Sequence, residues 1–146
     1  MMHFQTPPNI CNYMVNMLPD GIQTVLEPTP GEGNLVKALS NYTVTAPSNF
    51  WAVHGTYDAI VMNPPFTPMN LGYKILFSCM EMSDNVIALM PWLTLINSER
   101  RTKYLMDYGL KSVTHLPRST FKGSRVQTCI LELKRGWDEQ CIFKAL

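Results

Sequence analysis

The chain has 146 residues, of which 46% are hydrophobic and 16% are charged, and its formal net charge is +1. This composition is typical of a folded globular protein and excludes a disordered chain. We expect residues 1–146 to form a single domain, because the length is too small for two. The longest apolar run, residues 86–96, contains Pro91 and is too short to cross a bilayer, so a membrane protein is excluded.

The four cysteines and three histidines are dispersed along the chain, without the paired spacing of zinc ligands. We therefore expect no metal site, reduced thiols and a cytoplasmic location. The first eight residues contain neither a basic stretch nor an apolar run, so we expect no signal peptide.

Charge is unevenly distributed along the sequence. Residues 1–99 contain two basic and seven acidic side chains, whereas residues 100–125 contain seven basic side chains and one acidic one. Such a basic segment is either an ordinary solvated surface or a surface that contacts phosphate groups. The candidates for phosphate contacts are Arg100, Arg101, Lys103, Arg118, Lys122 and Arg125.

Hydrophobic spacing and turn residues predict alternating helices and strands. In chain order we expect a helix at 8–18, a strand at 24–26, a helix at 34–42, strands at 43–46 and 59–62, a helix at 70–82, a strand at 86–90, a helix from Ser98 to Tyr108, and strands at 112–116 and 127–133. Ser98 is placed to cap its helix and Gly109 to stop it. This alternation predicts an α/β fold with an open, mostly parallel sheet and an antiparallel C-terminal pair of strands.

Two motifs follow predicted strands. The strand at 24–26 leads into Glu27-Pro28-x-x-Gly31-x-Gly33 before a helix, and these glycines allow a ligand to approach the backbone closely. The strand at 59–62 leads into Asn63-Pro64-Pro65-Phe66, whose prolines fix the backbone and present the Asn63 amide and the Pro64 carbonyl as acceptors. Taken alone, each motif has a second interpretation, in which it is only a turn that ends a strand and binds no ligand. Because ligands bind where the strand order of an α/β sheet reverses, we expect both motifs to share one crevice.

Together these motifs resemble a known family. Phe4-x-Thr6-Pro7-Pro8, the glycine motif and Asn63-Pro64-Pro65-Phe66, in that order, are similar to the S-adenosylmethionine-dependent N6-adenine DNA methyltransferases in which a Thr-Pro element precedes the glycine motif. Residues 121–131 resemble the last loop and strand of that family. The resemblance implies a Rossmann-like class I methyltransferase fold. The short spacing between Gly33 and Asn63 indicates that the sheet has a trimmed edge.

The resemblance also implies roles for individual residues. S-adenosylmethionine would be held by Phe4, Thr6, Pro7, Glu27, Pro28, Gly31 and Gly33. The catalytic residues would be Asn63, Pro64, Pro65 and Phe66. Asn63 and Pro64 would accept hydrogen bonds from the adenine amino group, and Phe66 would stack on a flipped base. The late loop, with Arg118, Phe121, Lys122 and Arg125, would contact the nucleic acid. This chemistry requires no metal.

The sequence departs from the family pattern in two places. No Asp or Glu lies between Glu32 and Asp58, where the family has a carboxylate that binds the ribose hydroxyls of the cofactor. Asn49, with Phe50 or Trp51, could contact the cofactor adenine without replacing that carboxylate, so we expect weak cofactor binding or none. Residues 136–146 are too few to read a DNA sequence, which makes a separate target-recognition subunit a candidate partner.

Three functions therefore remain open. The first is methyl transfer to adenine N6 in DNA, which the Thr-Pro element favours. The second is methyl transfer to RNA or to protein glutamine, because the Asn-Pro-Pro-Phe motif is shared with such enzymes. The third is a catalytically inactive protein of this fold that binds nucleic acid or a partner, which the missing ribose carboxylate favours.

Overall fold

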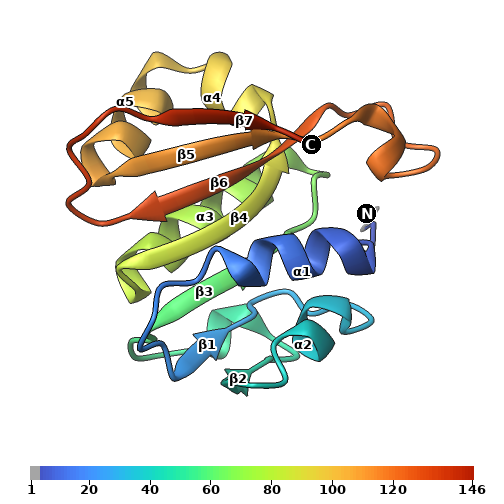
Figure 1. Ribbon diagram of the computed structural model, residues 1–146, viewed down its shortest axis with the longest axis vertical. Helices are drawn as coiled ribbons and strands as arrows, with labels where there is room; N and C mark the ends of the chain where they lie inside the picture. The colour runs from blue at the N-terminus through green and yellow to red at the C-terminus, as the bar shows by residue number, and fades with distance from the viewer. Residues whose placement is uncertain (1–3) are drawn as a thin grey trace.

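The computed structural model describes residues 4–146, in which a seven-stranded sheet carries helices on both faces (Figure 1). The strands are β1 (Thr24–Leu26), β2 (Thr43–Thr45), β3 (Ala59–Met62), β4 (Asn85–Pro91), β5 (Leu110–His115), β6 (Thr128–Lys134) and β7 (Ile142–Ala145). The helices are α1 (Pro8–Asn16), α2 (Asn34–Ala38), α3 (Met69–Met82), α4 (Leu93–Ile96) and α5 (Glu99–Tyr108), with short 3-10 helices η1 (Phe50–Ala52) and η2 (Arg118–Thr120). No helix within residues 4–146 is long and apolar enough to cross a bilayer.

The order and direction of the strands confirm the predicted α/β sheet. The order is β2-β1-β3-β4-β6-β5-β7. Neighbours among the first four are parallel, β6 runs antiparallel to both β4 and β5, and β7 is parallel to β5. The chain passes from β1 outward to β2 and then crosses to β3 on the other side of β1. The carboxyl ends of β1 and β3 therefore meet where the strand order reverses, which is the usual place for a ligand.

β7 is a strand that the hydrophobic pattern does not predict. Ile142 and Phe143 are 51% and 67% exposed, so the segment lacks the alternation of buried and exposed side chains that marks a strand. It becomes a strand because its backbone pairs with the edge of β5. Residues 136–146 therefore end in a strand of the sheet.

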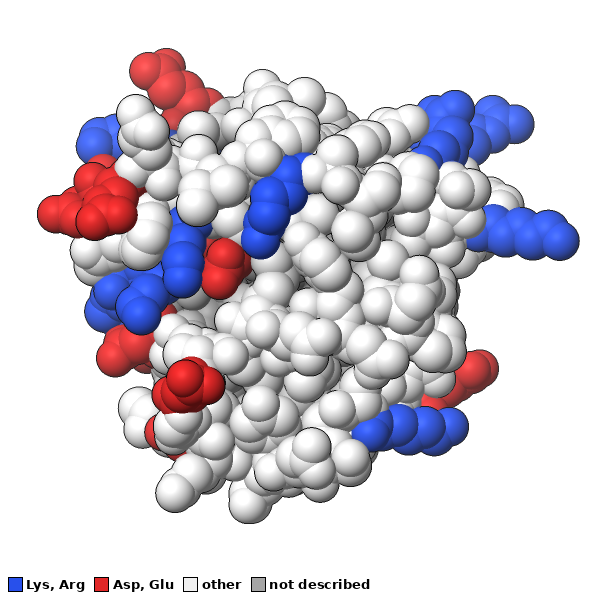
Figure 2. Space-filling model, in the orientation of Figure 1, with Lys and Arg blue, Asp and Glu red and all other residues white. Residues whose placement is uncertain are grey.

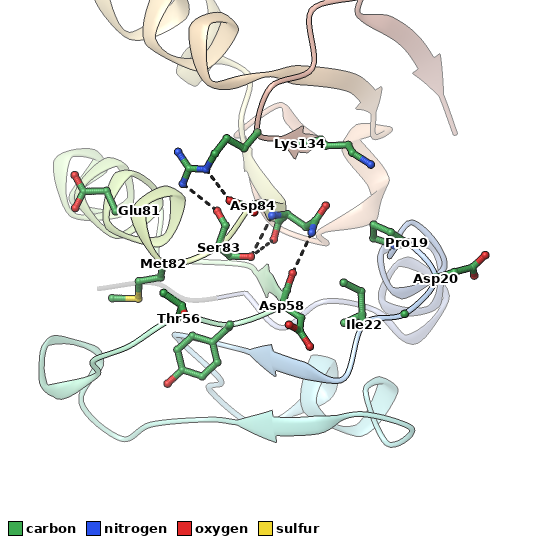
Figure 3. A pocket seen from close by; sticks show the side chains of 14 residues that line it. Pro19, Asp20, Ile22, Thr56, Asp58, Glu81, Met82, Ser83, Asp84 and Lys134 are labelled. Atoms are coloured by element: carbon green, nitrogen blue, oxygen red, sulfur yellow. Dashed lines mark hydrogen bonds and ion pairs between the residues drawn. The ribbon is translucent and has the colours of Figure 1, made fainter.

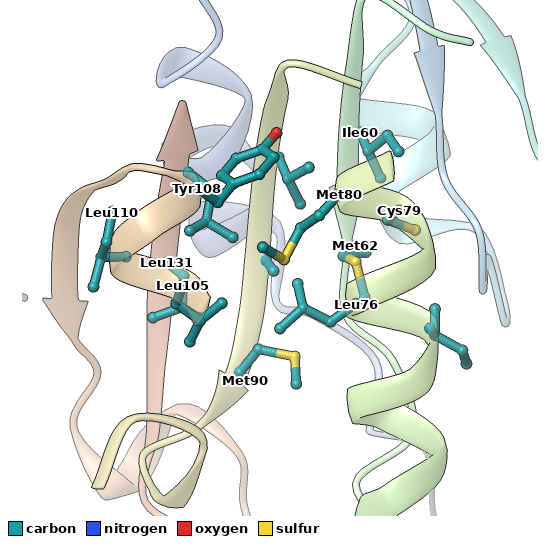
Figure 4. Close-up of a cluster of buried hydrophobic side chains, with 14 of the residues drawn as sticks. Ile60, Met62, Leu76, Cys79, Met80, Met90, Leu105, Tyr108, Leu110 and Leu131 are labelled. Atoms are coloured by element: carbon teal, nitrogen blue, oxygen red, sulfur yellow. The ribbon is translucent and has the colours of Figure 1, made fainter. Parts of the chain in front are cut away.

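Both faces of the sheet are buried against apolar clusters. Along β4, Val86, Ala88 and Met90 belong to one cluster, and Ile87 and Leu89 belong to the other, as the two-residue period of a strand requires. The first cluster is completed by α3 and α5 (Figure 4), and the second by α1 and α2. Burial on both faces explains why residues 86–90 form a continuous apolar run.

The helix boundaries follow the predicted signals in α5 and differ elsewhere. Ser98 Oγ accepts a hydrogen bond from Arg101 N at 3.2 Å, and Gly109 ends the helix with a φ of 134°, which confirms the predicted start and stop. α2 ends at Ala38, earlier than predicted, because the Ser-Asn pair that follows favours turns over helix. α1 likewise ends early, at Asn16.

Candidate functional site

The predicted crevice forms at the carboxyl ends of β1 and β3. β1 leads into Glu27 and the glycine turn, and β3 leads directly into Asn63. The two loops touch, because the Thr29 hydroxyl donates a hydrogen bond to the Asn63 carbonyl oxygen at 3.4 Å. The fold therefore brings the glycine motif and the Asn-Pro-Pro-Phe motif together, although they are far apart in the sequence.

The N-terminal segment, residues 4–7, joins these two motifs. Asn63 is buried, and its Nδ2 donates to the Phe4 carbonyl oxygen at 2.8 Å and to Thr6 Oγ1 at 2.9 Å. The Thr6 carbonyl oxygen accepts from Asn34 Nδ2 at 2.9 Å, and Asn34 is the first residue of α2 after the glycine turn. Thr6 is 1% exposed and belongs to the framework of the site. Pro7 directly precedes α1 as its N-cap residue.

A cavity of about 430 Å³ lies beside the glycine turn. Five residues predicted for the site are among its lining: Pro28, Gly31, Asn49, Phe50 and Pro65. Gly31 has a φ of 55°, in the left-handed region that glycine tolerates best. The fold thus places part of the predicted cofactor set and one proline of the predicted catalytic set around a single cavity.

The lining of this cavity is poor in polar groups. Within residues 4–146 no carboxylate lines it, and its polar side chains are Thr29 together with Ser48 and Asn49, which follow β2. Asn49 Oδ1 accepts a hydrogen bond from Trp51 N at 3.1 Å, which caps η1. Trp51 is 55% exposed, whereas Phe50 is 7% exposed and packs edge-on against it with the ring centroids 4.9 Å apart. Trp51 is therefore the more accessible aromatic surface for a planar ligand.

Glu27 is the buried acid of the site. Its side chain is 2% exposed, and Oε1 accepts a hydrogen bond from Thr29 N at 2.8 Å. Burial raises the pKa of this carboxyl from 4.5 to about 8, and the Thr29 N–H offsets part of that increase. Glu27 is therefore mostly protonated at neutral pH in the folded chain. Gly33, with a φ of 90°, precedes the five-residue helix α2 as its N-cap.

A second cavity, of about 240 Å³, is lined by Phe4 and Phe66 together with Thr67 and residues 123–126. Phe66 is 8% exposed and packs edge-on against Phe121, with the ring centroids 6.4 Å apart. Phe121 also contacts Phe4 at a centroid distance of 6.0 Å and is itself part of an apolar core cluster. The late loop thus contributes residues 123–126 to the cavity lining, while Phe121 holds the two lining aromatic rings in place.

The loop between β5 and β6, residues 116–127, carries the exposed cations Arg118, Lys122 and Arg125. Arg118 Nη2 donates to the Arg125 carbonyl oxygen at 3.2 Å, and Arg125 also lines the cavity beside Phe66. Figure 2 shows basic side chains projecting from the side of the molecule where this loop lies in Figure 1. These cations are therefore placed beside the candidate site.

Two of the other predicted phosphate contacts, Arg101 and Lys103, form bonds within the protein. Arg101 Nε donates to the Thr94 carbonyl oxygen at 2.8 Å, and its guanidinium lies 3.9 Å from the centre of the Tyr73 ring. Lys103 forms an ion pair with Asp107 at 2.9 Å. Arg101 therefore joins α4 and α3 to α5, and Lys103 pairs along α5.

A larger cavity, of about 660 Å³, lies at the other end of the strands, where the parallel strands begin (Figure 3). Asp58 Oδ2 accepts hydrogen bonds from Thr24 N at 3.0 Å and Gln23 N at 2.9 Å, and these bonds lower the pKa of the Asp58 carboxyl. Asp84 pairs with Arg135 at 2.7 Å. These polar groups tie the strand ends together. Within residues 4–146, no three His, Cys, Asp or Glu side chains are grouped as metal ligands.

Thr29 and Asn34 belong to the site and were not predicted from the sequence. Asn34 had a signal, because a polar side chain at the start of a helix commonly bonds to nearby backbone. Thr29 had none, since its bond to the Asn63 carbonyl exists only once the two loops meet.

No protein-family model matches the sequence, and no curated protein matches it. Solved structures do match the fold. The methyltransferase subunit of a type I restriction-modification system from Streptococcus thermophilus is 15% identical, with a TM-score of 0.77 over 98% of this chain and 47% of that one. A proposed class I S-adenosylmethionine-dependent methyltransferase from Listeria monocytogenes is 14% identical, with a TM-score of 0.74 over 97% and 65%. The 23S rRNA methyltransferase ErmE is 16% identical, with a TM-score of 0.63 over 92% and 70%.

These similarities confirm the predicted fold, which is the Rossmann-like class I methyltransferase fold with a mostly parallel sheet and an antiparallel strand pair near the C-terminus. The chain spans about half the length of the restriction-modification subunit that it matches. At these identities the likeness concerns the fold, and function is argued from the site.

Proposed function

We propose that this chain transfers a methyl group from S-adenosylmethionine to the N6 amino group of adenine in DNA. The observation that carries the proposal is the position of the Asn63-Pro64-Pro65-Phe66 motif, called the Asn63 motif below. Asn63 is buried and its Nδ2 donates to the Phe4 carbonyl oxygen and to Thr6 Oγ1, Pro65 lines the cavity beside the glycine turn, and Phe66 lines the cavity beside the β5–β6 loop. The motif therefore stands between two cavities, as a reaction between two bound molecules requires.

The cavity beside the glycine turn would hold the cofactor, which when bound supplies a methyl group on a positively charged sulfur. Its volume of about 430 Å³ lies in the range of roughly 300–1,000 Å³ that is usual for small-molecule sites. Gly31 would allow close approach to the backbone, and Trp51 offers an aromatic surface to the adenine ring. Among the described lining residues that follow β2, Ser48 and Asn49 are the polar side chains that could bond the ribose hydroxyls, and neither is a carboxylate, so we expect weak cofactor binding.

The Asn63 motif would make the adenine amino group a better nucleophile. The nitrogen lone pair of this group is delocalised into the ring and is therefore a poor electron donor. Hydrogen bonds from the two N–H groups to Asn63 Oδ1 and to the Pro64 carbonyl oxygen favour a pyramidal nitrogen, on which the lone pair is localised. This chemistry depends on acceptors held in the right place and needs no strongly basic side chain.

The target base would enter the cavity of about 240 Å³ after it leaves the stacked helix. Phe4 and Phe66 are the aromatic rings of its lining and would contact the face of the base. Arg125 lines the same cavity, and Arg118 and Lys122 lie on the same loop. These three cations would bind the phosphates on either side of a flipped nucleotide.

DNA is favoured as substrate by the Thr-Pro element and its contact with the Asn63 motif. RNA is the second candidate, because ErmE shares the fold and is an rRNA methyltransferase. Phosphate contacts of the β5–β6 loop would confer little sequence choice. We therefore propose that a separate subunit selects the target sequence.

The proposal is tested by transfer of a labelled methyl group to unmethylated DNA, to RNA and to a glutamine-containing peptide, side by side. Asn63→Ala should reduce labelling of adenine by about a hundredfold to a thousandfold, because one acceptor in the transition state is lost. Its affinity for S-adenosylmethionine, measured by calorimetry, should change little. Asn41→Ala alters an exposed asparagine and should retain the wild-type rate.

The outcomes separate the candidate functions. Label on RNA or on the peptide would replace DNA with that substrate. Cofactor binding without label on any substrate would contradict catalysis by the isolated chain and favour an inactive binding protein or a missing subunit. Equal labelling by the wild type and by Asn63→Ala, with both chains folded, would show that Asn63 has no role in transfer.

A further inference from the structure

We propose that Thr6 is a positioning residue that fixes the orientation of the Asn63 side-chain amide, and this inference rests on the proposed function. Thr6 lies in the N-terminal segment just before α1 and is 1% exposed. Its Oγ1 accepts a hydrogen bond from Asn63 Nδ2 at 2.9 Å. The two residues are distant in the sequence, and no pattern in the sequence requires this bond.

The contacts of Asn63 determine which way its amide faces. Nδ2 donates to the Phe4 carbonyl oxygen at 2.8 Å, and a carbonyl oxygen can only accept. The nitrogen, rather than Oδ1, must therefore face the N-terminal segment. An amide nitrogen carries two hydrogens, and Thr6 Oγ1 takes the second one. Because the nitrogen and the oxygen share one planar amide group, these bonds also fix the position of Oδ1.

This orientation matters because of the chemistry of the target. An amino group donates hydrogen bonds, so it needs Oδ1 of Asn63 and would be repelled by Nδ2. The flat amide can turn over by rotation about one side-chain bond, and a turned amide would offer a donor to a donor. Thr6 Oγ1, like the Phe4 carbonyl oxygen, accepts from Nδ2 and so disfavours the turned state.

Thr6 also links this amide to the cofactor side of the site. Its carbonyl oxygen accepts from Asn34 Nδ2 at 2.9 Å and from Cys11 Sγ at 3.4 Å. Asn34 directly follows Gly33 of the glycine turn. Thr6 thus contacts both the first residue of α2, which follows the glycine turn, and the side-chain amide of Asn63, so its bonds resist movement of either segment.

The test replaces the hydroxyl of Thr6 while keeping the side-chain shape. Thr6→Val should lower kcat for DNA methylation by about fivefold to tenfold, because one hydrogen bond that orients Asn63 is lost. KM for DNA and the affinity for S-adenosylmethionine should stay within about twofold of wild type, since Thr6 is buried and its hydroxyl accepts from Asn63 Nδ2. Thr6→Ser restores the hydroxyl and should restore kcat. Thr56→Val, at an exposed threonine, is the matched control.

A second pair of variants tests whether Thr6 acts through Asn63. In an Asn63→Ala chain, Thr6→Val should change the residual rate by less than about twofold, because the amide to be oriented is absent. A fully additive loss in the double variant would overturn the proposal. So would a wild-type kcat in Thr6→Val, or a Thr6→Ser chain as impaired as Thr6→Val.

A measurement without activity keeps the test independent of the proposed function. In the folded wild type, the two Nδ2 hydrogens of Asn63 should exchange slowly with water by nuclear magnetic resonance, and Thr6→Val should speed that exchange. Fast exchange in the wild type would overturn the inference even if Thr6→Val failed to fold. A wild-type chain with slow exchange that labels no substrate would refute the proposed function and leave the role of Thr6 in orienting Asn63 supported.

Discussion

Replacing Glu27 with Gln should change how the stability of this fold depends on pH. Glu27 is 2% exposed, and burial raises the pKa of its carboxyl to about 8, against an ordinary value of 4.5. Between these two pH values the folded chain keeps the proton on Glu27, whereas the unfolded chain releases it. The stability contributed by this proton is therefore complete below pH 4.5 and is lost as the pH rises through about 8.

The size of the effect follows from the difference of one bound proton. The free energy of unfolding should fall by about 1.4 kcal/mol for each pH unit in this interval. Between pH 5 and pH 8 the loss approaches roughly 4 kcal/mol, a large part of the roughly 5–15 kcal/mol that stabilises a typical domain. Glu27→Gln keeps the size of the side chain and an oxygen to accept from Thr29 N, but it carries no titrating proton.

Urea unfolding followed by tryptophan fluorescence at pH 5, 6, 7 and 8 measures this difference. The wild type should lose stability steadily, and Glu27→Gln should lose much less. All other side chains are the same in the two chains, so their contributions cancel in the comparison. Glu32→Gln, at an exposed glutamate in the same turn, should behave like the wild type. Parallel stability curves for the wild type and Glu27→Gln would refute the reasoning.

Two further predictions concern ligands. Gly31→Val places a branched side chain at a φ of 55° beside the cavity of the glycine turn, and it should weaken S-adenosylmethionine binding in calorimetry by more than about tenfold. Unchanged binding by a folded variant would make the glycine turn purely structural. Replacing Arg118, Lys122 and Arg125 together with Gln should weaken DNA binding and reduce the slope of log affinity against log salt by about 2–3. An unchanged slope would make this loop an ordinary solvated surface.

Local signals in the sequence were enough to predict most of the fold. The continuous apolar runs at residues 59–62 and 86–90 indicated strands, and the burial of both strands explains why they show no polar side. Ser98 and Gly109 marked the two ends of α5 through backbone requirements that few other residues meet. β7 escaped prediction because its exposed side chains follow no pattern and its backbone pairs with an existing edge.

For the candidate site too, some features follow from the sequence and others only from the tertiary structure. The sequence by itself determined that the glycine turn and Asn63 follow neighbouring parallel strands, since strand order and right-handed crossovers place their carboxyl ends together. Only the tertiary structure decided that Thr6 bonds to Asn63, that Phe121 is buried between aromatic neighbours, and that Arg101 bonds to the Thr94 carbonyl oxygen. Hydrogen bonds and ring contacts between distant segments depend on how those segments pack. A polar or aromatic residue in a loop could pair with many different partners, and its sequence context does not specify which one it contacts.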